Sequence, residues 1–95
     1  MVARAARPID LAGRTLCDLR GLRADDAVTE VERQIDAAFL QGMPFVRIIH
    51  GKGSGALRKA VREALQSNPA VKSAETGKDQ EGGEGVTIAF LHGDA

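Results

Sequence analysis

The sequence contains few of the residues that mark specialised classes of protein. Its 95 residues include one cysteine, three phenylalanines as the only aromatic side chains, and no net charge. The single cysteine, Cys17, cannot form an internal disulfide or a cysteine-based metal site. We therefore expect a small buried side chain there and a protein of the reducing cytoplasm. Without tryptophan or tyrosine, the chain shows no aromatic platform of the kind on which many single-strand binders stack bases.

Long apolar runs are also missing. No run approaches the length that spans a membrane, so we expect neither a transmembrane segment nor a membrane partner. Residues 1–13 carry basic side chains but no apolar core, so they do not read as a signal peptide. We interpret 1–13 as a linker or lead-in cut from a longer protein, 14–91 as a single domain, and 92–95 as a C-terminal tail.

The zero net charge conceals an uneven distribution. In residues 42–73 the single acidic residue is Glu63, whereas the basic residues are Arg47, Lys52, Arg58, Lys59, Arg62 and Lys72. Such a basic block would attract a polyanion. A solvated helix face accounts for the same residues, so the pattern leaves both interpretations open.

Apolar periodicity predicts an alternation of strands and helices. Strands are predicted over 15–19, 45–50, 71–76 and 86–91, and helices over 26–41 and from Leu57 to the stop at 67–69. A flexible glycine-rich loop is predicted over 77–85. Strand–helix–strand units favour parallel pairing, and the last two strands suit a hairpin. The predicted fold class is α/β, a two-layer sandwich of order β-α-β-α-β-β with a mixed four-stranded sheet and two helices.

The segment "HGKGSG" at 50–55 joins the second predicted strand to the second helix. Its glycines allow close backbone approach, and the start of a helix offers unpaired amides to an anion. The segment does not match the spacing of a Walker loop or of a dinucleotide fingerprint, and a tight turn without a ligand remains an alternative. The candidate phosphate-binding residues are Gly51, Lys52, Gly53, Ser54, Gly55, Arg58, Lys59 and Arg62.

His50 ends a predicted strand beside this segment and is a candidate catalytic group. The motif "CDLRG" ends the first strand, which the crossover could bring near the second. Asp18 could then orient the imidazole, accept from loop amides, or simply pair with Arg20 to fix a turn. With a phosphate nearby, His50 could move a proton while Arg20 and Lys52 stabilise charge. The catalytic candidates are thus Asp18, Arg20, His50 and Lys52, and no compact carboxylate cluster suggests a two-metal centre.

The stretch from "CDLRG" through "HGKGSGALR" to "GGEGVTIAFL" resembles the Smr (small MutS-related) domain over about residues 14–91. The resemblance is closest to the C-terminal domain of the bacterial MutS paralogue of type 2. Two positions depart from the family pattern. Cys17 stands where leucine is usual, and Arg20 stands where many Smr domains carry histidine, so a mechanism using two histidines is in doubt.

The resemblance implies the same β-α-β-α-β-β sandwich, nucleic-acid binding and, in many members, nicking endonuclease activity. The implied parent protein is a homodimeric ATPase linked to suppression of recombination and to rescue of collided ribosomes. The implied partners are branched or plasmid DNA and rRNA, and the isolated domain is expected to be monomeric. No nucleotide site is expected here, since ATP belongs to the parent, and the sequence leaves open whether a divalent metal such as Mg²⁺ or Mn²⁺ takes part.

Three functions therefore compete at this stage. The first is a nicking endonuclease that selects structure rather than sequence. The second is a non-catalytic module that docks on DNA or rRNA. The third is a protein-interaction domain that uses the acidic first helix, with Glu30, Glu32 and Asp36, although we interpret that charge as a solvated face.

Overall fold

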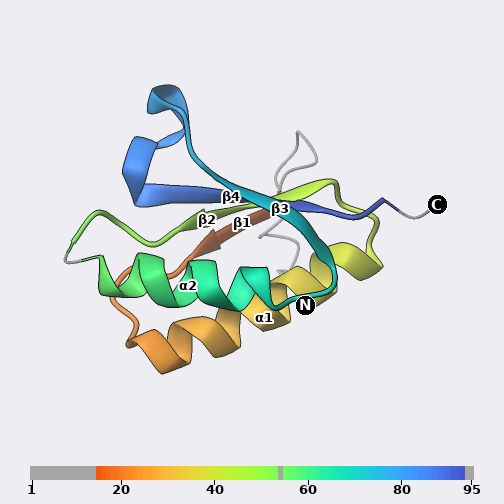
Figure 1. The fold of residues 1–95 in the computed structure, drawn as a ribbon, viewed down its shortest axis with the longest axis horizontal. Helices are drawn as coiled ribbons and strands as arrows, with labels where there is room; N and C mark the ends of the chain where they lie inside the picture. Colours follow the sequence, from red (N-terminus) through yellow and green to blue (C-terminus); the bar gives the residue numbers. More distant parts are fainter. Residues whose placement is uncertain (1–14, 54, 94–95) are drawn as a thin grey trace, which may run out of the picture.

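The computed structural model describes residues 15–53 and 55–93. The predicted lead-in at 1–13 and the end of the predicted tail, 94–95, lie outside the described residues, as does Ser54. The elements are β1 (Thr15–Asp18), α1 (Ala24–Leu40), β2 (Phe45–Ile49), α2 (Ala56–Gln66), β3 (Val71–Thr76) and β4 (Val86–Leu91). Figure 1 shows their order along the chain. The predicted fold class is confirmed, and predicted boundaries differ by no more than two residues.

The sheet has the order β1-β2-β4-β3, with β4 inserted between the two strands that flank α2. β1 and β2 are parallel, and β4 is antiparallel to both β2 and β3. Each strand–helix–strand unit therefore keeps its strands parallel, as the crossover rule favours. As a result, the carboxyl ends of β1, β2 and β3 share one end of the sheet with the start of α2 (Figure 1).

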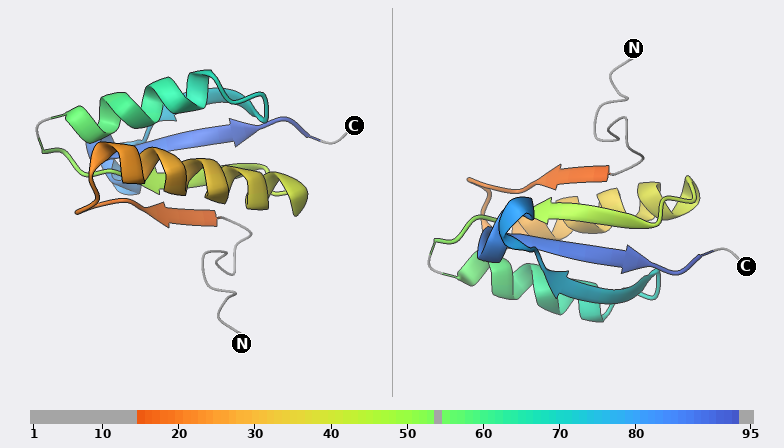
Figure 2. Two further views of the ribbon diagram at one scale, coloured as in Figure 1. Left: turned by 90° about the horizontal axis from the view of Figure 1, so that it is seen from below. Right: turned by 90° about the horizontal axis from the view of Figure 1, so that it is seen from above.

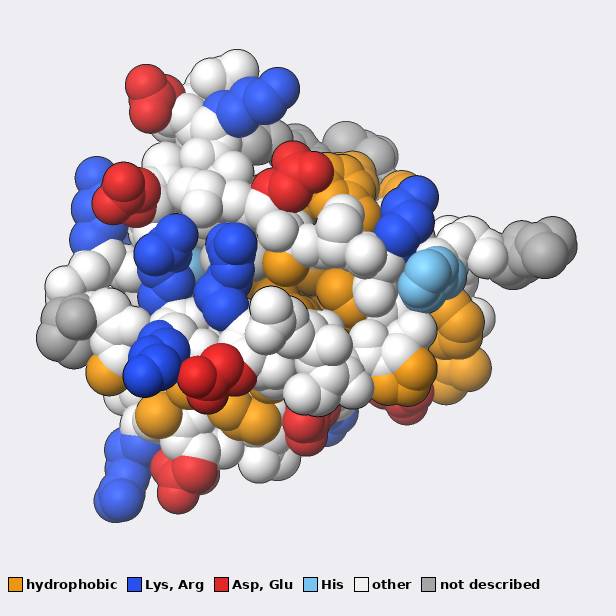
Figure 3. All heavy atoms as spheres, viewed as in Figure 1, with side chains coloured by type: hydrophobic (Ala, Val, Ile, Leu, Met, Phe, Trp, Pro, Cys, Tyr) orange, Lys and Arg blue, Asp and Glu red, His pale blue; other side chains and the backbone are white. Residues whose placement is uncertain are grey.

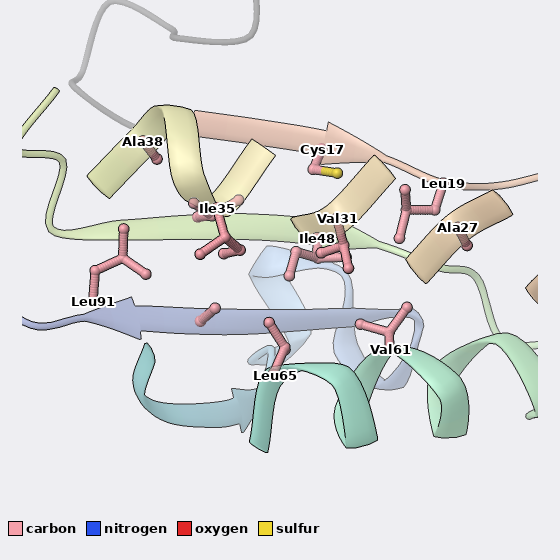
Figure 4. Packing of buried hydrophobic residues seen from close by; sticks show 12 residues of the cluster. Cys17, Leu19, Ala27, Val31, Ile35, Ala38, Ile48, Val61, Leu65 and Leu91 are labelled. Atoms are coloured by element: carbon pink, nitrogen blue, oxygen red, sulfur yellow. The ribbon is translucent and has the colours of Figure 1, made fainter. Parts of the chain in front are cut away.

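Both helices pack on one face of the sheet, so the core lies between two layers (Figure 2). Ile35 and Val31 of α1 and Val61 and Leu65 of α2 are fully buried and point at Ile48 and its neighbours (Figure 4). Successive strand residues face opposite sides. In β2 the alternation places Val46 and Ile48 towards the helices.

The segment 77–85 differs from the predicted flexible loop. It forms two short 3₁₀ turns, η2 (Asp79–Glu81) and η3 (Gly83–Gly85), on the sheet face opposite the helices (Figure 2). Gly77 N–H donates to the Val86 carbonyl at 2.9 Å, and Gly83 N–H donates to the Lys78 carbonyl at 2.9 Å. These hydrogen bonds give the segment a defined path that its composition does not reveal. Within the described residues, neither helix is long and apolar enough to cross a membrane.

Candidate nucleic-acid interface

The glycine segment runs from the end of β2 to the start of α2 and is tied to the turn before β4. The Gly85 carbonyl accepts from His50 N–H at 3.0 Å and from Gly51 N–H at 2.9 Å. Gly51 has φ +82°, a conformation that L side chains rarely adopt. The amide of Gly51 is thus engaged within the protein and is not available to a ligand. Because Gly51 has no side chain, its backbone is open to close approach.

The start of α2 supports anion binding through its position. Gly55 precedes the helix with φ 89° and no side-chain cap. Ser54, one of the candidate phosphate-binding residues, lies outside the described residues. Gly53 and Lys52 are exposed beside this end, so both the positive end of the helix dipole and a mobile cation face solvent here.

His50 is 5% exposed and uses both ring nitrogens. Nδ1 lies 2.9 Å from the Gly51 carbonyl, and Nε2 lies 2.8 Å from the Thr87 hydroxyl. Burial lowers the pKa of His50, and the positive charges of Arg58 and Arg62 lower it further, against the opposing effect of the Gly51 hydrogen bond. The imidazole is therefore neutral at neutral pH. Because a carbonyl only accepts, Nδ1 carries the hydrogen of the neutral ring, and Nε2 carries none.

The arginines of α2 reach across to the ends of two strands. Arg58 donates to the Thr76 hydroxyl at 3.1 Å, and Arg62 donates to the Thr87 hydroxyl at 3.4 Å. The Nε of Arg58 is buried without a hydrogen-bond partner in the part of the chain that the structure describes. Lys59 is exposed next to them. Figure 3 shows the resulting concentration of Lys and Arg side chains around the first turns of α2.

Asp18 and Arg20 form a two-pronged ion pair beyond the end of β1. Arg20 donates from Nε to Oδ1 at 2.9 Å and from a terminal nitrogen to Oδ2 at 2.8 Å. The side-chain hydrogen bond from Arg20 lowers the pKa of Asp18. Oδ1 also accepts from the Arg20 backbone N–H at 3.1 Å. Of the three roles considered for Asp18, the structure thus shows the pairing with Arg20 and acceptance from a loop amide, whereas the partners of the His50 ring are Gly51 and Thr87.

The predicted catalytic residues divide between the two faces of the sheet. Asp18 lies between Cys17 and Leu19, which are buried in the core, so it faces away from the helices. Arg20 and Lys52 line a hollow of about 290 Å³ on that side, together with Arg47, Ile49, Val86 and glycines 51, 82 and 85. His50 lies on the helix side. The structure thus brings Asp18, Arg20 and Lys52 to one side of the loop and His50, Arg58 and Arg62 to the other.

Sequence reasoning missed Thr87 and Gly85 as site residues, and it counted Arg47 in the basic block without placing it beside the glycine loop. Both Gly85 and Thr87 lie in the motif "GGEGVT", which supported the family resemblance but did not reveal that they contact His50. Arg47 lies in an apolar strand, and its alternation with Val46 and Ile48 could have shown that it faces away from the core. Among the described residues, no three of His, Cys, Asp and Glu are grouped so that they could hold a metal ion.

The fold and this end of the sheet define a class of protein: a two-layer α/β domain that presents a basic glycine loop and a buried histidine. The model of the Smr domain family matches residues 17–92, and the chain belongs to that family. The resemblance read from the sequence is thereby confirmed.

Relatives and solved structures agree with this assignment. Over 74 residues the chain is 55% identical to "Endonuclease MutS2" of Symbiobacterium thermophilum and 51% identical to "Putative endonuclease MutS2" of Bacillus subtilis. Each match covers 78% of this chain but 9% of the relative, so the chain spans a small part of the proteins that it matches.

Two solved structures share the architecture. The crystal structure of the Smr domain of Thermus thermophilus MutS2 has a TM-score of 0.79 and 43% identity, and the match covers 81% of this chain and 96% of that one. YdaL from Escherichia coli, a stand-alone small MutS-related protein, has a TM-score of 0.77 and 25% identity over 81% of this chain and 63% of that one.

Proposed function

We propose that this domain is a nicking endonuclease that hydrolyses phosphodiester bonds in nucleic acid and selects structure rather than sequence. The observation that carries the proposal is a neutral histidine whose Nε2 carries no hydrogen, placed beside Arg58 and Arg62 where the glycine loop begins. The endonuclease names of the relatives support the same reaction. A basic loop and the start of a helix bind phosphates. Phosphate contacts position a protein on nucleic acid but carry no information about the base sequence.

The chemistry assigns separate roles to the two sides of the loop. On the helix side, the attacking water displaces the Thr87 hydroxyl from Nε2 of His50 and gives its proton to that nitrogen as it attacks phosphorus. Arg58 and Arg62 stabilise the negative charge on the phosphoryl oxygens. On the other side, Lys52 and Arg20 bind adjoining backbone phosphates, and Asp18 holds Arg20 in place. The leaving oxygen takes its proton from solvent. Hydrolysis leaves one strand cut.

A second function, docking on DNA or rRNA without cleavage, is favoured by the burial of His50. Because His50 is 5% exposed, cleavage requires Arg58 and Arg62 to move towards the phosphate and uncover the side of the ring that faces Thr87. Binding alone requires no such movement. Docking predicts salt-sensitive affinity, as phosphate contacts always give, with no cut strand.

The setting of the domain is part of the same proposal. By analogy with its longer relatives, we propose that the domain works in the cytoplasm within a dimeric protein and acts on branched DNA or on ribosomal RNA. This setting would link it to suppression of recombination and to rescue of collided ribosomes.

Nicking of supercoiled plasmid by the purified chain tests the reaction. We expect the wild type to convert supercoiled to relaxed plasmid and His50→Ala to lose about 10²- to 10⁴-fold in rate, the usual contribution of a general base. Lys72→Ala, at the opposite end of the sheet, is the matched control and should cut at the wild-type rate. Equal cutting by His50→Ala would remove His50 from the chemistry, and binding without cutting by the wild type would establish docking instead. A parallel reaction with a chelator shows whether a divalent ion takes part.

A further inference from the structure

Thr87 sits at the centre of a chain of hydrogen bonds that nothing in the reaction above has used. It is the second residue of β4, it is fully buried, and its hydroxyl contacts both His50 and Arg62. Its two partners come from different parts of the fold: His50 follows β2, and Arg62 lies on α2.

Hydrogen-bond chemistry fixes the direction of each link. The Gly51 carbonyl accepts from Nδ1, so the neutral ring leaves Nε2 without a hydrogen. The Thr87 hydroxyl, 2.8 Å away, therefore donates its one hydrogen to Nε2. Its lone pairs remain free to accept from Arg62, whose terminal nitrogen lies 3.4 Å away. The chain runs from Arg62 through Thr87 and His50 to Gly51, and each link joins a donor to an acceptor.

The residue type suits the position. Threonine is stiff about χ1, so a hydroxyl on β4 is held at a fixed angle to the ring at the end of β2. Thr87 pairs with Ile48, the second residue before His50, in the antiparallel register. The charges that face the imidazole come from Arg58 and Arg62 on α2 and disfavour a second ring proton.

We propose that Thr87 is a positioning residue of this site: its hydroxyl holds His50 in the Nδ1–H tautomer, so that Nε2 carries no hydrogen when the attacking water takes the place of the hydroxyl. The effect of Thr87 on the nicking rate rests on the proposed nuclease function, whereas its effect on the tautomer of His50 does not. Holding the wrong tautomer of a catalytic histidine is costly because the ring then presents a donor where the reaction needs an acceptor.

The test separates these two statements. Nitrogen-15 spectra of the His50 ring, recorded on the 95-residue chain near neutral pH, should show a protonated Nδ1. Nε2 should carry no hydrogen and should accept a hydrogen bond. Thr87→Val removes the hydroxyl and keeps the shape, so the Nε2 resonance should move towards that of a free neutral imidazole. Thr87→Ser should restore it. A wild-type ring protonated on Nε2, or a Thr87→Val spectrum identical to the wild type, would overturn the proposal, and the wild-type spectrum decides even where the valine variant does not fold.

The plasmid assay then measures the consequence. We expect Thr87→Val to nick about 10- to 100-fold more slowly with unchanged plasmid binding, and Thr87→Ser to recover most of the rate. If the wild type cuts and Thr87→Val cuts equally fast, the positioning role fails while the nuclease function stands. If the wild type does not cut at all, the nuclease function fails, and the ring spectra alone test whether Thr87 fixes the tautomer of His50.

Discussion

Burial of His50 links the chemistry of the site to the stability of the fold. Its pKa is lowered in the folded chain from a reference value of 6.5, first by burial and then by the nearby arginines. The unfolded chain therefore binds a proton more readily than the folded chain. The free energy of unfolding should fall as pH drops below about 6.5, and the loss should be complete once pH passes below the folded pKa.

This prediction can be checked by urea unfolding between about pH 5 and about pH 8, the range in which histidine changes charge. Asp18 and Glu30, whose pKa values are also lowered, lose their contribution at more acidic pH and fall outside this window. His50→Gln should flatten the pH dependence relative to the wild type. A wild-type stability that rises as pH falls through this window would contradict the burial of a neutral ring.

The residue scale is also where sequence reasoning is least complete. The motifs identified His50, Lys52 and the arginines of α2, and chain order correctly brought the ends of β1 and β2 together. The partner of His50 could not be predicted, because Thr87 approaches it through the insertion of β4 between β2 and β3. Local spacing carries no information on such a contact.

At the scale of elements, the turns between β3 and β4 shape the loop that carries the site. Gly82 has φ +115°, and a Cβ built there would lie 2.4 Å from a methyl carbon of Val86. We predict that Gly82→Ala lowers the free energy of unfolding by about 1–3 kcal/mol, because both the backbone and Val86 must shift. Thermal or urea unfolding measures the change.

Gly53→Ala is the matched control, since a Cβ at Gly53 meets nothing within 4 Å and no unusual φ is required. Its stability should stay within about 0.5 kcal/mol of the wild type, as for ordinary surface substitutions. Equal stability of the two variants would show that the turn is not held as described.

The elements themselves were largely predictable. Apolar periods of two and of about three and a half residues identify the strands and helices, and the prediction for 71–76 matches β3. The 3₁₀ turns of 77–85 were not predictable, because glycine and charged residues also compose flexible loops. Their order depends on backbone hydrogen bonds such as that from Gly77 to Val86.

At the scale of the whole molecule, the two ends of the sheet differ in chemistry. One end carries His50, Lys52 and the arginines of α2. The other carries a hollow of about 530 Å³ lined partly by Phe39, Leu40 and Met43. The zero net charge therefore describes neither end, and a polyanion approaching the protein meets attraction mainly at the first.

The central claim is that nucleic-acid phosphates bind at the end of the sheet that carries the glycine loop. The most direct measurement is a titration of the isotope-labelled chain with a short branched DNA, followed by amide chemical shifts. Shifts should concentrate in 50–62 and 82–87 and should diminish as salt is added. Shifts centred on residues 39–44 and 92, or on the acidic face of α1, would contradict the claim, as would the absence of shifts at low salt.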